Sequence, residues 1–210
     1  MTWGNIAVTI LGSVLGLASG IAATCAVRRL TLVPRHTVLL HAALGLTLGA
    51  LIGWRVAPAA YAAACLVFLA FALPLSAIDA ATQQMPNRIL LPAIPVCAAA
   101  NALAAAAAHD YTPLWRCLMA GAVVFAAFTA FAMIFIRRLG FGDCKAAGLC
   151  ALPLGYLSWG SVLLGVLLAY VLAAIYVVVV RATRSGKLGV LPFGPFLFAG
   201  CLAAVLVARY

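Results

Sequence analysis

The chain has 210 residues, of which 68% are hydrophobic and only 8% are charged, and its formal net charge is +10. A soluble domain carries roughly 25% charged residues, so this composition excludes a water-soluble globular protein and predicts an all-α, polytopic transmembrane helix bundle. Basic residues of membrane proteins gather in cytoplasmic loops, and the positive charge therefore predicts a membrane topology and no nucleic-acid partner.

Eight apolar segments are predicted to cross the bilayer, since one helical span needs about 20 mainly apolar residues. The first charges, Arg28 and Arg29, follow the first apolar segment, which favours a retained span over a cleaved signal. Residues 146–180 are too long for one span and short for two, and Pro153, Gly155 and Gly160 favour a hairpin with a short or tilted first helix. The predicted spans are 4–27, 37–54, 57–78, 89–108, 114–136, 146–157, 158–180 and 188–208 of a single domain, 1–210.

The basic residues support eight spans with both termini outside. Ten of the 13 Lys and Arg residues then fall on one side of the membrane, whereas a single span over 146–180 would leave seven against six. The side with the excess is expected to be cytoplasmic. It holds Arg28, Arg29, Arg35, Arg88, Arg137, Arg138, Lys145, Arg181, Arg184 and Lys187, and the other side holds Arg55, Arg116 and Arg209.

The cysteines, histidines and serines favour neither a metal site nor a nucleophilic enzyme. None of the seven cysteines forms a C-x-x-C pair, and a free cysteine in an apolar segment behaves as a small hydrophobic residue. His36, His41 and His109 are far apart, and the chain contains no G-x-S-x-G motif. We therefore expect no metal and no cofactor.

The acidic residues are the candidates for chemistry, because ionisable groups in membrane spans are costly and mark functional sites. There are only three, and Asp110 lies in a short external loop where it is expected to be solvated. Asp79 is expected at the cytoplasmic edge of the third span, before the turn that Pro86 fixes. Asp143 lies where the sixth span starts, so the topology places both aspartates at one membrane face.

Two neighbouring carboxylates can share a proton, because their repulsion and partial burial raise one pKa and leave the other low. The ionised member then takes a proton from water while the protonated member polarises a peptide carbonyl, which hydrolyses the peptide without a covalent intermediate. Gly140 and Gly142 are expected to allow irregular backbone beside Asp143, so that a substrate strand or water can approach.

Structural roles for the same residues stay open at this point. Asp143 follows a glycine-rich turn and suits a helix N-cap. Asp79 is suited to an interfacial ion pair with Arg88. Lys145 is two residues beyond Asp143 and does not share its helical face, so we expect a cytoplasmic anchor first and a supporting charge partner second.

Taken together, the two acidic motifs resemble those of the type IV prepilin peptidases, which are polytopic aspartyl proteases with a G-x-G-D motif. Two further segments are similar to the first span with its basic loop and to the opening of the last span of this family. The similar segments are Ile78-Asp79 through Thr82 to Pro86-Asn87, Gly140-Phe141-Gly142-Asp143-Cys144-Lys145, Leu11-Gly12-Ser13 through Arg28-Arg29-Leu30, and Leu191-Pro192-Phe193-Gly194-Pro195-Phe196-Leu197.

The resemblance implies that Asp79 and Asp143 are the catalytic pair and that Gly140 and Gly142 form the motif scaffold. It also implies a substrate, a prepilin or pilin-like secretion protein whose short basic leader is cut at the cytoplasmic face of the bacterial inner membrane. Many members carry an insert with two C-x-x-C pairs, linked to methylation of the new pilin N-terminus, where this chain has only Leu30–His36. We therefore predict peptidase activity without methyltransferase activity.

Two other functions are compatible with the sequence. A transporter or channel would use the two aspartates as proton or cation sites, but such sites usually lie near the bilayer midplane, and both acids are predicted near span ends. An inactive structural subunit of a pilus or secretion assembly would be free to lose either aspartate, and this chain retains both.

Overall fold

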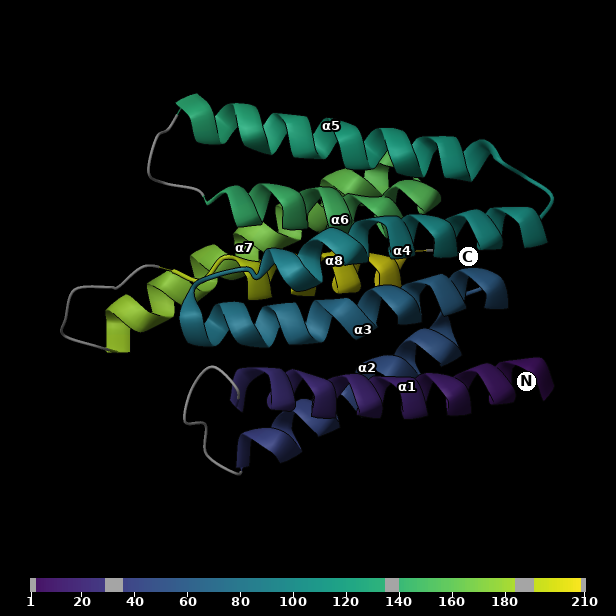
Figure 1. Cartoon of the computed structure of the whole chain (residues 1–210), viewed down its shortest axis with the longest axis horizontal. Coiled ribbons are helices and arrows are strands. Elements are labelled where there is room, and N and C mark those ends of the chain that lie inside the picture. Colours follow the sequence, from purple (N-terminus) through teal and green to yellow (C-terminus); the bar gives the residue numbers. More distant parts are fainter. Residues whose placement is uncertain (1–2, 29–35, 135–139, 184–190, 209–210) are drawn as a thin grey trace.

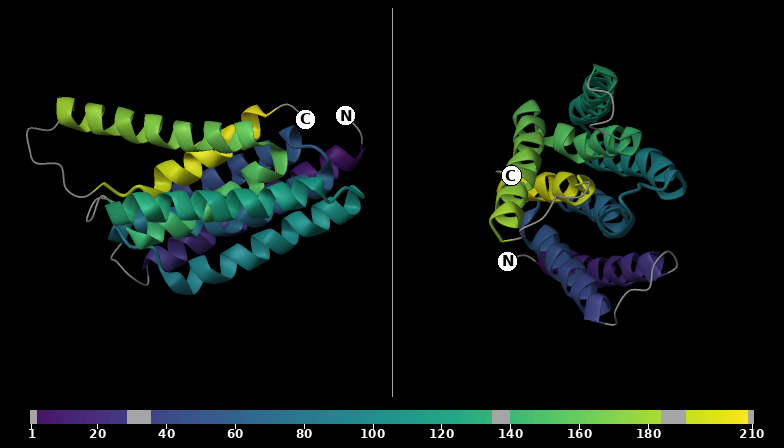
Figure 2. Two further views of the ribbon diagram at one scale, coloured as in Figure 1. Left: turned by 90° about the horizontal axis from the view of Figure 1, so that it is seen from above. Right: turned by 90° about the vertical axis from the view of Figure 1, so that its left-hand side faces the viewer.

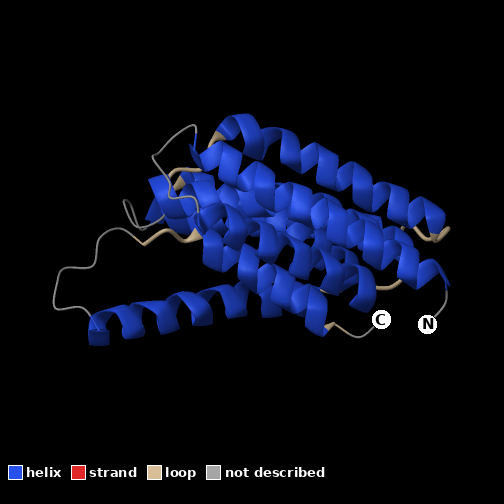
Figure 3. Ribbon diagram, turned by 90° about the horizontal axis from the view of Figure 1, so that it is seen from below, coloured by secondary structure: helices blue, strands red, loops and turns tan. Residues whose placement is uncertain are grey.

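The computed structural model describes residues 3–28, 36–134, 140–183 and 191–208, and within these ranges the regular structure is entirely helical (Figures 1 and 3). This confirms the predicted all-α bundle. Its helices are α1 (Trp3–Arg28), α2 (His36–Arg55), α3 (Ala59–Thr82), α4 (Asn87–Ala107), α5 (Thr112–Ile134), α6 (Phe141–Leu157), α7 (Trp159–Thr183) and α8 (Gly194–Val207).

Six helices within the described ranges, α1 to α5 and α7, are long and apolar enough to cross a membrane. The other two are shorter, with 17 residues in α6 and 14 in α8. Helix α6 is buried on nearly all sides from Ala146 to Tyr156. It is therefore an internal helix of the bundle, and this explains why its sequence is apolar all round.

The hairpin predicted within 146–180 is confirmed, and its break lies at Ser158. This residue is extended, with φ −169° and ψ 163°, and its hydroxyl accepts a 3.0 Å hydrogen bond from the backbone N–H of Ser161 in the first turn of α7. At the same end of α6, the Arg116 guanidinium donates to the carbonyls of Gly155 (2.7 Å) and Leu157 (2.8 Å). The last carbonyls of α6, which lack helical partners, are thereby paired.

The helices alternate in direction along the bundle. The C-terminal ends of α1, α3, α5 and α7 and the N-terminal ends of α2, α4, α6 and α8 lie at the left-hand end in Figure 1, which faces the viewer in the right-hand view of Figure 2. Helices α1 and α2 form one edge and α5 the other, and α7 flanks α8 (Figure 2). The ends of α3 and α6 that carry the two predicted catalytic aspartates are therefore at the same end of the bundle.

Glycines allow α1 and α2 to pack at backbone contact. A β-carbon added at Gly12 or Gly16 would collide with the carbonyl of Gly49 or Gly45 on the facing helix, and one at Gly20 would collide with the backbone of α2. The glycines of the first span thus form a packing surface, because close approach of two membrane helices requires small residues.

Helices α3, α6 and α8 share the centre of the core. Tyr61 of α3 stacks on Tyr156 of α6 with ring centroids 4.5 Å apart, and its hydroxyl donates a 2.7 Å hydrogen bond to the carbonyl of Pro153. The ring of Phe68 of α3 packs against that of Phe198 of α8, with ring centroids 6.1 Å apart. These buried contacts fix the relative positions of the three elements from which the candidate site is built.

Three predicted boundaries differ from the structure by four residues or more. Helix α3 continues to Thr82 instead of ending at 78, because no proline or glycine follows residue 78 before Pro86, and the helix stops where Gln83 adopts a left-handed conformation with φ 55° and ψ 30°. Helix α6 begins at Phe141 instead of 146, and so includes Asp143. Helix α8 begins at Gly194, after the predicted start at 188, which lies outside the described residues.

Candidate active site

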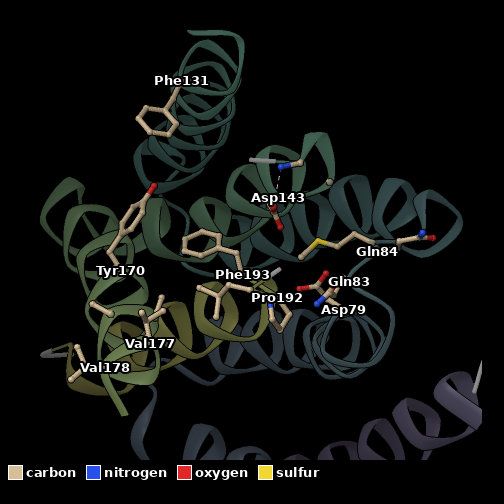
Figure 4. A pocket seen from close by; sticks show the side chains of 16 residues that line it. Asp79, Gln83, Gln84, Phe131, Asp143, Tyr170, Val177, Val178, Pro192 and Phe193 are labelled. Carbon is tan, nitrogen blue, oxygen red and sulfur yellow. Dashed lines mark hydrogen bonds between the residues drawn. The ribbon is translucent and has the colours of Figure 1, made fainter. Parts of the chain in front are cut away.

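A cavity of about 1050 Å³ lies at the end of the bundle where α3 ends and α6 begins (Figure 4). Both Asp79 and Asp143 line it, so the structure brings together two residues that are far apart in sequence. The other lining residues are Gln83, Gln84, Met85, Phe131, Gly140, Gly142, Tyr170, Ala173, Ala174, Val177, Val178, Leu191, Pro192 and Phe193.

Asp79 lies in the last turn of α3 and is only 4% exposed. Asp79 is thus close to the end of the helix, as predicted, but its side chain is buried within the bundle. Its Oδ2 accepts a 2.9 Å hydrogen bond from the backbone N–H of Gly194 at the start of α8. Arg88 is exposed, and the interactions of the described residues do not join it to Asp79, so the predicted ion pair is absent from this part of the chain.

Asp143 is the third residue of α6, and its Oδ2 accepts a 3.2 Å hydrogen bond from the backbone N–H of Gly140. The N-cap residue is Gly140, so the predicted N-cap role of Asp143 is wrong in position, although its carboxylate does cap the helix from within. The pKa of Asp143 is raised to about 6, mainly by burial and also by the nearby Asp79 carboxylate. The hydrogen bond from the Gly140 N–H acts in the opposite direction and lowers the pKa.

The two carboxylates repel each other, and this repulsion is one of the causes of the raised pKa of Asp143. In Figure 4 both side chains point toward the same space from neighbouring helices. Asp110, the third acid of the chain, is exposed in the loop between α4 and α5, where its Oδ1 accepts a 2.9 Å hydrogen bond from the Thr112 N–H. Its predicted place in a solvated loop is confirmed.

Gly142 serves the site by its lack of a side chain. A β-carbon at this position would lie 3.0 Å from Cβ of Met85, so the glycine makes room for the chain that follows α3. Gly140 has φ −78° and ψ 148°, which any residue adopts, and Gly142 is helical. The prediction of irregular backbone at these two glycines is therefore wrong. At position 142 a glycine is needed because of the close packing against Met85.

Sequence reasoning did not identify Gly194 and Met85 as site residues. A β-carbon at Gly194 would lie 2.7 Å from Oδ2 of Asp79 and would collide with Cε of Met85. The Met85 side chain thus packs against Gly142 of α6 with one end and Gly194 of α8 with the other. In the sequence, Gly194 could have been noticed because it lies between Phe193 and Pro195 where the last span begins. A glycine in such a place is typical of close backbone approach.

Neither of the two predicted supporting residues, Lys145 and Arg88, is among the residues that line the cavity. Lys145 donates a 2.9 Å hydrogen bond from Nζ to Oδ1 of Asn87, which ties α6 to the first turn of α4. It lines a separate apolar groove between α4, α5 and α6, in agreement with its expected place on another face from Asp143. Arg88 is exposed on the first turn of α4.

An aromatic shelf, which we define as Phe128, Tyr170 and Phe193, lies on the inner side of the cavity. The Tyr170 ring is 6.4 Å from the Phe128 ring and 5.3 Å from the Phe193 ring, measured between centroids. Tyr170 and Phe193 line the cavity, and Phe128 is buried behind them. Helix α7 ends at the end of the bundle that holds the aspartates, and Tyr170 comes before its other lining residues. The shelf therefore lies deeper in the bundle than those residues.

A comparison with known protein families gives one match, and comparisons with curated proteins and with solved structures give none. The model of the type IV leader peptidase family matches residues 66–178, from within α3 to within α7, and this stretch contains Asp79, Asp143 and both motif glycines. The match covers more than half of the 210 residues, and with the paired carboxylates in one cavity it shows that this chain belongs to the type IV leader peptidase family.

Proposed function

We propose that this protein is a membrane aspartyl endopeptidase that removes the short basic leader from a prepilin or pilin-like secretion protein, with Asp79 and Asp143 as the catalytic pair. The observation that carries the proposal is that two acidic side chains, from distant positions of an otherwise acid-poor chain, line one cavity. The peptidase unit is the whole chain, 1–210, in the bacterial inner membrane.

The pair acts by general acid–base catalysis. Asp143, whose pKa is raised to about 6 by burial and by Asp79, is the member that holds the proton and donates a hydrogen bond to the carbonyl oxygen of the scissile peptide. Asp79 takes a proton from a water molecule, whose oxygen attacks the carbonyl carbon. The C–N bond then breaks, and the leaving nitrogen takes up the proton.

Positioning of the two acids supports these roles. The Gly194 N–H fixes Oδ2 of Asp79, and the Gly140 N–H fixes Oδ2 of Asp143. The peptide N–H groups at the start of α6 also stabilise the negative charge of Asp143 when it has lost its proton. Side chains held in this way need little rearrangement before the reaction.

The cytoplasmic membrane face is supported by the distribution of charge. The aspartates lie at the end of the bundle to which ten of the 13 basic residues are assigned by the alternation of the helices. Basic residues are retained in the cytoplasm, and the leader of the substrate is expected on the same side.

The alternative of an ion-transport site is less well supported, since Asp79 lies in the last turn of α3 and Asp143 in the first turn of α6, at helix ends and not near a midplane. An inactive assembly subunit would show no cleavage at all. Both alternatives are decided by the experiment that follows.

The test is cleavage of candidate prepilins from the same source by the purified protein in nanodiscs, with the cut located by mass spectrometry. We expect Asp79→Asn and Asp143→Asn each to lower the rate by about 10²–10⁴-fold, the usual contribution of a general acid or base. Asp110→Asn is the matched control, because this exposed acid lies in the loop between α4 and α5, and it should cleave at the rate of the unmodified protein. Wild-type-level cleavage by either active-site variant would overturn the proposal.

A further inference from the structure

The cavity at the aspartates has two chemically different sides. One side, from the end of α3 and the start of α6, carries the two carboxylates together with Gln83 and Gln84. The other side is apolar and consists of Phe131 of α5 with Ala173, Ala174, Val177 and Val178 of α7. An occupant that suits both sides has a polar segment joined directly to an apolar one.

The apolar side of the cavity continues onto the membrane-facing surface. Phe131 is 44% exposed and Val178 is 66% exposed, although both line the cavity. The exposed side chains next to them are also apolar, namely Met133, Ile134 and Val179. Since α5 and α7 are apolar enough to cross a membrane, large exposed side chains on them face lipid, and the cavity therefore opens sideways toward the bilayer.

The shape of the opening is set by the two helices. Helices α5 and α7 approach each other at Phe128 and Tyr170, within the aromatic shelf. Toward their C-terminal ends they diverge, and α7 lies well apart from α5 at that end of the bundle (Figure 2). The opening is thus bounded at its inner end by the aromatic shelf.

We propose, on the basis of the proposed function, that the opening between α5 and α7 admits an apolar helix of the substrate sideways from the bilayer, and that the first apolar side chain beyond the cut packs on Tyr170 and Phe193. The occupant is a membrane-inserted polypeptide whose scissile bond joins a polar segment to an apolar helix. The polar segment lies against Gln84 and the carboxylates at the cytoplasmic end.

The size and lining of the cavity support a polypeptide occupant. Its volume of about 1050 Å³ is slightly above the roughly 300–1,000 Å³ of small-molecule sites, so it has room for several residues. Peptide groups that leave a membrane helix must find new hydrogen-bond partners. Carboxylate and amide side chains provide such partners on the polar side, whereas a lipid acyl chain would leave that side unmatched.

The first test places a photo-reactive benzoylphenylalanine at Val178 or at Val179, in the Asp79→Asn protein in nanodiscs, with a full-length tagged precursor. The two valines are adjacent and both more than half exposed, but only Val178 lines the cavity. We expect a precursor crosslink from position 178 that exceeds that from position 179 by at least about fivefold, since the two side chains point about 100° apart around the helix. Equal crosslinks, crosslinks to lipid alone, or crosslinks to a second copy of this chain would overturn the proposal.

The second test narrows the opening. Ala174→Trp fills the apolar side of the cavity, and Ala182→Trp places the same side chain on an exposed position of α7 outside it. Each variant is given two substrates, the full-length membrane precursor and a short peptide that contains the leader and ends soon after the cut. In Ala174→Trp the ratio of precursor to peptide cleavage should fall at least about tenfold, because a small misplacement of a substrate costs up to 10²-fold in rate.

The two substrates separate failure of this inference from failure of the proposed function. If the unmodified protein cleaves neither substrate, the proposed function is wrong, and the inference falls with it. If the protein cleaves both and Ala174→Trp changes the ratio no more than Ala182→Trp does, the peptidase assignment stands and sideways access between α5 and α7 is wrong.

Discussion

The backbone N–H of Gly194 donates a 2.9 Å hydrogen bond to Oδ2 of Asp79, which lies 115 positions earlier in the chain. This bond links the start of α8 to the last turn of α3 and holds one of the two candidate catalytic acids inside the bundle. The role of Gly194 is positional, because its backbone touches the acid and its missing side chain leaves room for both Asp79 and Met85.

Gly194→Ala should lower peptide cleavage by about 10–100-fold, since a misplaced catalytic group loses rate without loss of fold. The added β-carbon would lie 2.7 Å from Oδ2 of Asp79 and would push the carboxylate or α8 away. Gly160→Ala is the matched control, because the nearest atom to its added β-carbon is the Ser158 hydroxyl at 3.6 Å. Equal rates in the two variants would contradict a positioning role for Gly194. The measurement is the rate of precursor cleavage, with thermal unfolding to show that both variants fold.

The rate of cleavage should fall as the pH rises through about 6. Asp143 must be protonated to donate to the substrate carbonyl, and its pKa is raised to about 6 by burial and by the neighbouring Asp79 carboxylate. Above this pH the protonated fraction drops tenfold for each pH unit. The check is kcat/KM for a peptide substrate between pH 4 and 8, where a rate that rises steadily through this range would exclude Asp143 as the acid.

Asp143→Asn should increase the thermal stability of the protein at pH 7. Because the pKa of Asp143 is higher in the folded state, at about 6, than its ordinary value of 3.8, the folded state binds more protons, and stability falls as the pH rises between these values. Asparagine carries no charge to bury and keeps an oxygen for the Gly140 N–H. The gain in Tm should therefore be present at pH 7 and disappear below about pH 4. Asp110→Asn, at an exposed position, should show no such gain.

Gly16→Ala should destabilise the protein by about 1–3 kcal/mol, the usual range for an overpacked interface. The added β-carbon would collide with the carbonyl of Gly45, so α1 and α2 would have to move apart. The helix propensity of alanine favours the substitution, and a net loss of stability therefore reports the interhelical contact alone. Thermal unfolding in detergent measures the effect, with Gly160→Ala as the control, and a Tm at or above that of the unmodified protein would contradict the packing.

The candidate site shows where sequence reasoning reached its limit. The alternating direction of the predicted spans was enough to place Asp79 and Asp143 at one end of the bundle, because the direction of each span follows from the one before. The burial of Asp79 was not predicted, since it depends on contacts with distant residues such as Gly194 of α8. The end of α3 was predicted at 78 instead of Thr82, because the length of a helix depends on local residues whose preferences differ by less than about 1 kcal/mol.

By itself, the sequence determined that this protein is a helical membrane bundle, since 68% hydrophobic residues cannot be hidden from water in a soluble fold of 210 residues. It also singled out the two acids, because charged groups in such a chain are rare. Only the tertiary structure decided that Gly194 holds Asp79, that Met85 packs between α6 and α8, and that residues of α5 and α7 complete the lining of the cavity. These features depend on contacts between residues far apart in the chain, and such contacts are set by how whole helices pack, which no local pattern of residues specifies.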